Sequence, residues 1–305
     1  MPRNPDDVFA EIRSLTTESR NPRTREIDLA DVPRILELLN DEDARVAAAV
    51  RAALADVARA VERVVASLRA GGRLVYAGAG TSGRLGVIDA AECPPTFGVP
   101  PDMVVGIIAG GRDTVFLSRE GLEDDEASGA TDVGSAGVEA RDTVVGIAAS
   151  RRTPYVLGAL AEARRRGAST VLVRCNEGPA PDVDVVITVV PGPEAITGST
   201  RLKAGTAQKM VLNMISTASM IQLGKVYENL MVDLRPNSEK LVERGKGIVM
   251  MLTGLDYAAA SRAYEAGGRD VKTAVVMQRL SLTREAAERR LDAAGGFLAR
   301  ALGER

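Results

Sequence analysis

The stretch that decides the fold is Arg73-Leu-Val-Tyr-Ala-Gly-Ala-Gly-Thr-Ser-Gly83, an apolar run followed at once by a glycine-rich turn. The apolar residues predict a buried strand. The glycines allow a tight turn, and Thr81 and Ser82 place hydroxyl groups beside the free backbone N–H groups that begin the next helix. A turn of this kind is suited to binding a phosphate ester. The sequence therefore predicts a strand, a phosphate-binding loop and a helix, in that order.

Four further short apolar runs follow, separated by segments with helical periodicity. We expect strands at 103–108, 143–148, 170–175 and 183–190. Most of these runs are continuously apolar, as a sheet covered on both faces requires. Strands that alternate with helices favour parallel pairing. The predicted fold class is therefore α/β, with a doubly wound, five-stranded parallel sheet and helices on both faces.

The segments around this region predict three parts in the chain. Residues 1–40 are polar and interrupted by prolines, which predicts an arm with a short helix. Residues 41–233 are expected to form the α/β domain, beginning with one long helix over 41–69. Residues 234–305 show no strand pattern and predict a small helical domain. Its helices are expected at 238–252, 256–266, 270–280 and 283–293.

Loops at the carboxyl ends of the predicted strands carry small polar residues. Ligands of doubly wound sheets bind beyond these ends, so the turns 78–83, 109–113 and 149–153 are expected to meet at one pocket. A third polar segment, Thr197-Gly-Ser-Thr200, precedes a long helix expected over 201–223. Taken singly, Ser82, Ser150 and Thr200 are each better explained as helix N-caps. Their recurrence at one sheet edge favours a phosphate site.

The chain contains no histidine and only two cysteines. This composition excludes a Ser-His-Asp triad, a His-ligated zinc and a cage of thiolates, so we expect neither metal nor cofactor. Proton transfer then falls to other groups, of which Glu92 and Glu123 are the candidates. Pro94 and Pro95 are expected to stop the helix that carries Glu92. The alternative for Glu123 is a solvated helix face, because it lies in an acidic run.

The composition also excludes two classes of partner. A net charge of −2 and an aromatic content of 3% oppose nucleic-acid binding. The longest apolar runs, such as 247–252, are too short to span a bilayer, and the first residues lack the apolar core of a signal peptide. We therefore expect a cytoplasmic protein that acts on a small molecule, away from membranes.

The spacing Gly78-x-Gly80-x-x-Gly83 also fits a dinucleotide-binding fingerprint. Two observations oppose that interpretation. The adjacent Thr81 and Ser82 put hydroxyls where a pyrophosphate normally meets bare backbone, and no strand ending in an acid follows about 20 residues later. The sequence therefore disfavours NAD.

Several segments together resemble the N-acetylmuramic acid 6-phosphate etherase family, and the resemblance covers nearly the whole chain. They are 78–96, 15–21, 148–155, 197–209 and Asn229-Leu-Met-Val-Asp233. The resemblance implies a sugar isomerase (SIS) domain, a homodimer and chemistry without metal. It also implies cleavage of the D-lactyl ether of N-acetylmuramic acid 6-phosphate, in peptidoglycan recycling, to N-acetylglucosamine 6-phosphate and D-lactate. By the same resemblance, Glu92 is the acid that protonates the departing lactate and Glu123 is the base at C2.

The polar loops and the resemblance together supply candidate ligands for the sugar phosphate. They are Thr81, Ser82, Gly83, Ser150, Arg151, Thr153, Ser199 and Lys203. Arg151 departs from the family, whose second loop usually has glycine there, and would either add a cation to the phosphate site or crowd it. Two alternatives share this fold. An aldose–ketose isomerase would release no lactate, and a non-catalytic sugar-phosphate sensor would need neither Glu92 nor Glu123.

Overall fold

The computed structural model describes residues 9, 12–150, 152–179 and 181–304, which form two compact units. The first unit comprises Met1–Ala91 and Asp102–Ser216 and contains the sheet. The second comprises Glu92–Pro101 and Thr217–Arg305 and holds the C-terminal helices. The domain limits at 40/41 and 233/234 stay a prediction.

The first unit is built on a parallel sheet whose described strands run in the order β2-β1-β3-β4-β5. The strands are β1 (Leu74–Gly78), β2 (Val104–Ile108), β3 (Thr143–Ala148), β4 (Ser169–Arg174) and β5 (Val185–Thr188). The predicted fold class and the predicted strands are confirmed. The strand order reverses between β1 and β3, and in such sheets a crevice opens at the carboxyl ends of the strands at this switch point.

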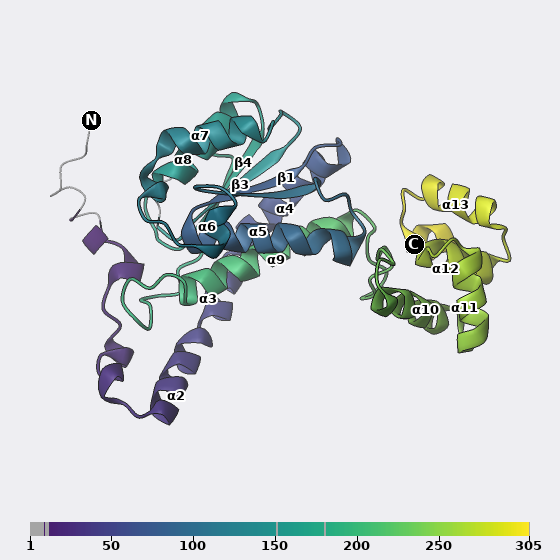
Figure 1. Ribbon diagram of the computed structural model, residues 1–305, viewed down its shortest axis with the longest axis horizontal. Coiled ribbons are helices and arrows are strands. Elements are labelled where there is room, and N and C mark those ends of the chain that lie inside the picture. Colours follow the sequence, from purple (N-terminus) through teal and green to yellow (C-terminus); the bar gives the residue numbers. More distant parts are fainter. Residues whose placement is uncertain (1–8, 10–11, 151, 180, 305) are drawn as a thin grey trace. The chain divides into compact units, whose positions relative to one another are not determined.

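Helices cover both faces of the sheet, which is why the strands are apolar throughout (Figure 1). One face carries α7 (Glu126–Ser135) and α8 (Pro154–Arg165), and Val75 and Ala77 share a buried core with residues of both helices. The other face carries α4 (Leu54–Arg69), α5 (Gly80–Phe97) and α9 (Lys203–Gln222). On this side the hydroxyl of Tyr76 donates to Asp89 Oδ2 of α5 at 2.7 Å.

The prediction of a single helix over 41–69 is wrong. The chain forms α2 (Val32–Asp43), α3 (Val46–Ala52) and α4, with short breaks between them. At the second break the N–H of Ala53 donates to the carbonyl of Val50 at 3.0 Å, a tighter bond than the α-helical pattern. Each break is only one or two residues long, so the apolar periodicity of the sequence continues across it. The periodicity therefore does not show where one helix ends and the next begins.

The prediction that Pro94 and Pro95 stop the preceding helix is also wrong. Helix α5 continues through both prolines to Phe97. Each proline removes one N–H donor but has a φ compatible with helix, and the carbonyl of Pro94 still accepts from Gly98 N at 3.0 Å. Gly98, with φ of +65°, provides the left-handed residue at which the helix ends.

The second unit contains a bundle of short helices around its own core. They are α10 (Glu239–Thr253), α11 (Tyr257–Ala266), α12 (Val271–Leu280), α13 (Arg284–Ala293) and α14 (Leu298–Leu302). Ser238, Asp256, Asp270 and Thr283 cap the first four, each accepting a hydrogen bond from a backbone N–H in the first turn. The four predicted C-terminal helices are confirmed. None of the described helices is both long and apolar enough to cross a membrane.

Candidate active site

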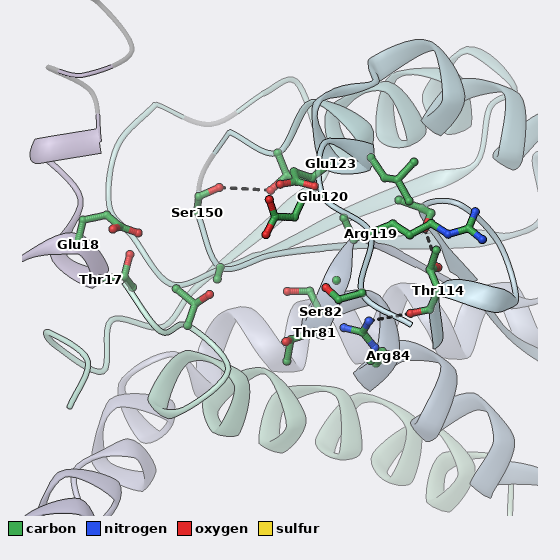
Figure 2. A pocket seen from close by; sticks show the side chains of 18 residues that line it. Thr17, Glu18, Thr81, Ser82, Arg84, Thr114, Arg119, Glu120, Glu123 and Ser150 are labelled. Carbon is green, nitrogen blue, oxygen red and sulfur yellow. Dashed lines mark hydrogen bonds between the residues drawn. The ribbon is translucent and has the colours of Figure 1, made fainter. Parts of the chain in front are cut away.

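A pocket of about 280 Å³ opens at the carboxyl ends of the strands, where the strand order reverses (Figure 2). Its wall includes residues that follow β1, β2 and β3, so the three turns predicted to meet do meet. The lining residues are Thr17, Glu18, Ala79, Gly80, Thr81, Ser82, Arg84, Ala109, Thr114, Ser118, Arg119, Glu120, Leu122, Glu123, Ala149, Ser150, Thr153 and Thr200. All of them belong to the first unit.

The glycine-rich turn brings the first turn of α5 to the pocket. Gly80 has φ of +54°, which favours glycine, and Thr81 and Ser82 then line the wall. Gly83 is buried behind them and is not a lining residue. A Cβ at Gly83 would lie 2.6 Å from the carbonyl oxygen of Gly78 and 2.7 Å from Ile108 Cγ1. Gly83 therefore permits close packing of helix on strand, which presents the helix N-terminus and its free N–H groups to a ligand.

The loop after β3 supplies two more of the predicted hydroxyls. Ser150 and Thr153 both line the pocket, and their hydroxyl oxygens are 3.2 Å apart. The N–H of Arg152 donates to Ser150 Oγ at 3.4 Å, and Pro154 begins α8 directly afterwards. Arg151 lies outside the described residues. The loop thus presents a pair of hydroxyls opposite the first turn of α5.

Glu123 lines the pocket, with Glu120 beside it in the view of Figure 2. Glu123 lies in the short helix η4 (Leu122–Asp124), and its side chain is exposed. The other predicted glutamate, Glu92, is exposed on α5, ten residues beyond Ser82, and is not a lining residue of this pocket. The roles of both glutamates stay predictions.

The N-terminal segment contributes a third carboxylate, that of Glu18. We call residues 15–24 the strap. Its Thr17 is buried, and Asn176 holds it by donating from Nδ2 to Thr17 Oγ1 at 3.0 Å and accepting from Thr17 N at 3.3 Å. Asn176 Nδ2 also donates to the carbonyl of Ala149, the residue before Ser150. The strap is thereby fixed to the second hydroxyl loop, and half-buried Glu18 is placed at the pocket wall.

Two arginines at the pocket wall contribute positive charge. The guanidinium of Arg84 donates to the carbonyls of Thr114 and Val115 at 2.7 and 2.9 Å. These bonds fix Arg84 without neutralising it, because carbonyls carry no charge. Arg119 also lines the pocket. A ligand with several negative charges would therefore meet cations as well as carboxylates here.

Lys203, a predicted phosphate ligand, has a different environment. Its side chain is fully buried, and Nζ lies 2.6 Å from Glu42 Oε2 and 3.0 Å from the carbonyl of Pro193. Burial by itself would raise the pKa of Glu42, but hydrogen bonds from Arg23, Lys203 and Asn21 outweigh it and lower that pKa to about 2. Neither Lys203 nor Ser199 lines the pocket. Their assignment as ligands remains untested.

Sequence reasoning missed several lining residues. Thr17 and Glu18 lie in the segment 15–21, which carries part of the family resemblance, and neither they nor Arg84, Arg119 and Glu120 stand out as candidate ligands in the sequence. A usable signal existed for Arg84, which directly follows the glycine-rich turn and so lies near the start of the same helix. For Glu18 the chain itself offers no signal, because its position depends on Asn176, which lies 159 residues from Thr17.

Comparison with known proteins places the chain in a family. Residues 56–164 match the model of the glucokinase regulatory protein N-terminal SIS domain. The chain is 54% identical to an N-acetylmuramic acid 6-phosphate etherase of Salinibacter ruber, over 98% of this chain and 97% of that protein. It is 53% identical to the one of a Geobacillus strain, over 95% and 99%, and 52% identical to the one of Bacillus subtilis, over 95% and 96%. The chain belongs to the N-acetylmuramic acid 6-phosphate etherase family.

Proposed function

We propose that the protein is a lyase that cleaves the D-lactyl ether of N-acetylmuramic acid 6-phosphate. The products are N-acetylglucosamine 6-phosphate and D-lactate, as peptidoglycan recycling requires. Family membership supports this reaction. The observation that carries the proposal is the pocket at the sheet's switch point, whose wall combines the N-terminus of α5, several hydroxyls and the carboxylate of Glu123.

The hydroxyl side of the pocket is the proposed phosphate site. A phosphate ester offers only acceptor oxygens and negative charge, so it needs donors and a positive potential. The first turn of α5 offers free N–H groups and the positive end of its dipole, and Thr81, Ser82, Ser150 and Thr153 offer hydroxyls. Holding the phosphate there would fix the sugar relative to the pocket carboxylates.

The proposed chemistry is elimination followed by hydration. In the open-chain sugar, C1 is an aldehyde, which makes the proton on C2 acidic. The lactyl oxygen is attached to C3, the carbon β to the C1 carbonyl, so it can leave by elimination. Glu123 would take the C2 proton and the C3–O bond would break. Glu92, which does not line this pocket and is assigned from family membership alone, would protonate the departing lactate oxygen. Water would then add at C3 while a proton returns to C2. Each proton-transfer group typically contributes about 10²–10⁴-fold to the rate.

Assembly and location belong to the same proposal. We infer a cytoplasmic homodimer that works without metal or cofactor. In the first unit, Leu29, Val32 and Leu36 are exposed apolar side chains near one another along the chain, at 81%, 68% and 61% exposure. An exposed apolar cluster supports association with another protein surface. Sedimentation velocity of the pure protein tests the dimer, and a monomer at micromolar concentration would contradict it.

The test of function is incubation with N-acetylmuramic acid 6-phosphate in water labelled with deuterium and with a heavy oxygen isotope, followed by assay of D-lactate. We expect lactate, solvent deuterium at C2 of the product and solvent oxygen at C3. An isomerase would release no lactate, and a sensor would bind without turnover. Retention of the original C2 hydrogen and C3 oxygen would contradict elimination.

Two variants test the glutamates separately. Glu123→Gln should lose both lactate release and C2 exchange. Glu92→Gln should lose lactate release while C2 exchange persists slowly, because deprotonation at C2 does not require lactate to leave. Glu126→Gln, at an exposed position in the same acidic run as Glu123, is the matched control and should behave as wild type. Normal exchange at C2 in Glu123→Gln would show that Glu123 is not the base and would favour the alternative, a residue on a solvated acidic helix face.

A further inference from the structure

Behind the pocket wall, Ser82 is hydrogen-bonded to Gln208 on α9. The Ser82 hydroxyl donates to Gln208 Oε1 at 2.9 Å. Ser82 is 8% exposed and Gln208 only 1% exposed, so the bond is shielded from water. The other end of the amide, Gln208 Nε2, is buried and has no hydrogen-bond partner. A buried amide nitrogen without a partner is uncommon and calls for an explanation.

This arrangement conflicts with binding a phosphate through Ser82. A serine hydroxyl carries one proton and can donate to one acceptor at a time. In the structure that proton is committed to Gln208, so Ser82 would present only lone pairs to a phosphate, which also has only lone pairs. As long as the amide keeps this orientation, the interaction between Ser82 and a phosphate would be repulsive.

We propose that Gln208 is a positioning residue that converts Ser82 into a phosphate donor. Half a turn about the last side-chain bond of Gln208 exchanges the amide oxygen and nitrogen. Nε2 then donates to Ser82 Oγ, and the Ser82 proton is released toward the pocket. Because Nε2 has no other partner, the rotation breaks no bond at the nitrogen end. The amide acts as acceptor in the empty pocket and as donor in the occupied one.

The start of α9, the helix that carries Gln208, is anchored to the preceding loop. The carboxylate of Glu194 accepts from the N–H groups of Lys203 and Ala204 at 2.8 and 2.9 Å, which anchors the first turn of α9. Glutamine supplies both a donor and an acceptor at one end, which leucine and glutamate do not. This inference rests on the sugar-phosphate pocket of the proposed function, but not on the lactyl elimination.

The experiment is a double-mutant cycle on phosphate affinity. Calorimetry measures the binding of N-acetylglucosamine 6-phosphate and of inorganic phosphate to wild type, Ser82→Ala, Gln208→Leu and the double variant. Loss of one hydroxyl bond to a charged group should weaken binding about tenfold or more. If Gln208 acts through Ser82, the effect of Gln208→Leu on binding disappears in the Ser82→Ala background, so the double variant binds no more weakly than Ser82→Ala alone.

A near-isosteric variant separates donation from packing. Gln208→Glu has almost the same size, and at high pH, where its carboxyl is ionised, it can only accept. It then holds the Ser82 proton and should bind phosphate at least as weakly as Ser82→Ala. Thr206→Ala, exposed on the same helix, is the control and should bind as wild type. Thermal melts of every variant identify any that are not folded.

Two outcomes would overturn the inference. Fold-losses that multiply in the double variant would show that the two residues act independently, and wild-type affinity in Gln208→Glu would show that the amide nitrogen is not needed. Failure of the proposed function looks different. A protein that passes this cycle yet releases no lactate would refute the etherase chemistry and leave the role of Gln208 standing.

Discussion

Replacing Lys203 by methionine decides whether this lysine holds the fold together or binds the substrate. Its ammonium group is fully buried, 2.6 Å from Glu42 Oε2, and it does not line the pocket. Methionine keeps most of the volume but removes the charge and all three donors. The change removes the buried cation beside the Glu42 carboxylate, which keeps Arg23, Arg45 and Asn21 as partners, and it leaves the carbonyl of Pro193 without the lysine donor.

The expected loss of stability can be worked from two directions. Removing one partner of a buried ion pair typically costs about 3–5 kcal/mol, because a charge stays buried without full compensation. Lowering the pKa of Glu42 from 4.5 to about 2 corresponds to roughly 3 kcal/mol for Arg23, Lys203 and Asn21 together, since one unit is about 1.4 kcal/mol, so the share of Lys203 lies at the lower end of the range for a buried pair. Because Arg23 remains bound to Glu42, we expect about 3 kcal/mol. For a domain of this size the melting temperature should fall by about 6–12 °C.

The assay combines thermal and urea unfolding with the KM for the sugar phosphate. Lys209→Met, at an exposed position on the same helix, is the control and should change stability by less than about 0.5 kcal/mol. Combining Lys203→Met with Glu42→Gln should recover part of the lost stability, because the double variant buries neither the ammonium nor the carboxylate of the pair. A Lys203→Met variant with wild-type unfolding and a strongly raised KM would refute the structural role and make Lys203 a ligand.

Three further predictions follow from individual side chains. Because the folded-state pKa of Glu42 is lowered to about 2, its contribution to stability is present above about pH 4.5 and is lost as the pH falls toward 2. Between pH 7 and pH 3, the free energy of urea unfolding should therefore fall less in Glu42→Gln than in wild type. Glu18→Gln should raise the KM for the sugar phosphate about tenfold without lowering the melting temperature, whereas Glu26→Gln, exposed in the same arm, should not; an unchanged KM would remove Glu18 from the site. Activity should survive exhaustive chelation, because a chain without histidine and with only two cysteines lacks the usual zinc ligands; a loss reversed by added metal would contradict this.

Much of the fold was predictable because its signals are local. A strand buried on both faces must be apolar along its whole length, and β1 and β3 are buried at every position. The breaks around α3 were not predictable in the same way. The apolar stripe that includes Val46, Val50 and Val57 continues across them, so the periodicity contains no sign of where the helix is interrupted. Pro94 and Pro95 also misled, because each proline removes one N–H donor without fixing the residue at which the helix ends, and α5 continues through both to Phe97.

The pocket was predictable in outline because a parallel sheet gathers the carboxyl ends of its strands at one edge. A polar residue directly after a strand therefore has a position that follows from topology, which is how Thr81, Ser82, Ser150 and Thr153 were found. The wall contributed by the strap was not predictable on this basis. It precedes the first strand, and its place is set by contacts with Asn176 and with Gly198, whose N–H donates to Thr17 O at 3.2 Å.

A charged residue in a polar motif is ambiguous because its role depends on its nearest opposite charge. Lys203 follows a hydroxyl-rich segment at a helix start, which is where a phosphate-binding lysine would also lie. Its partner Glu42 is 161 residues away along the chain, in α2, a helix that precedes all the strands. Once the pair forms, separating it to release the ammonium for a ligand would cost about as much as the pair contributes. We therefore expect Lys203 to stabilise the fold rather than to bind phosphate, and the unfolding and KM measurements on Lys203→Met distinguish the two roles.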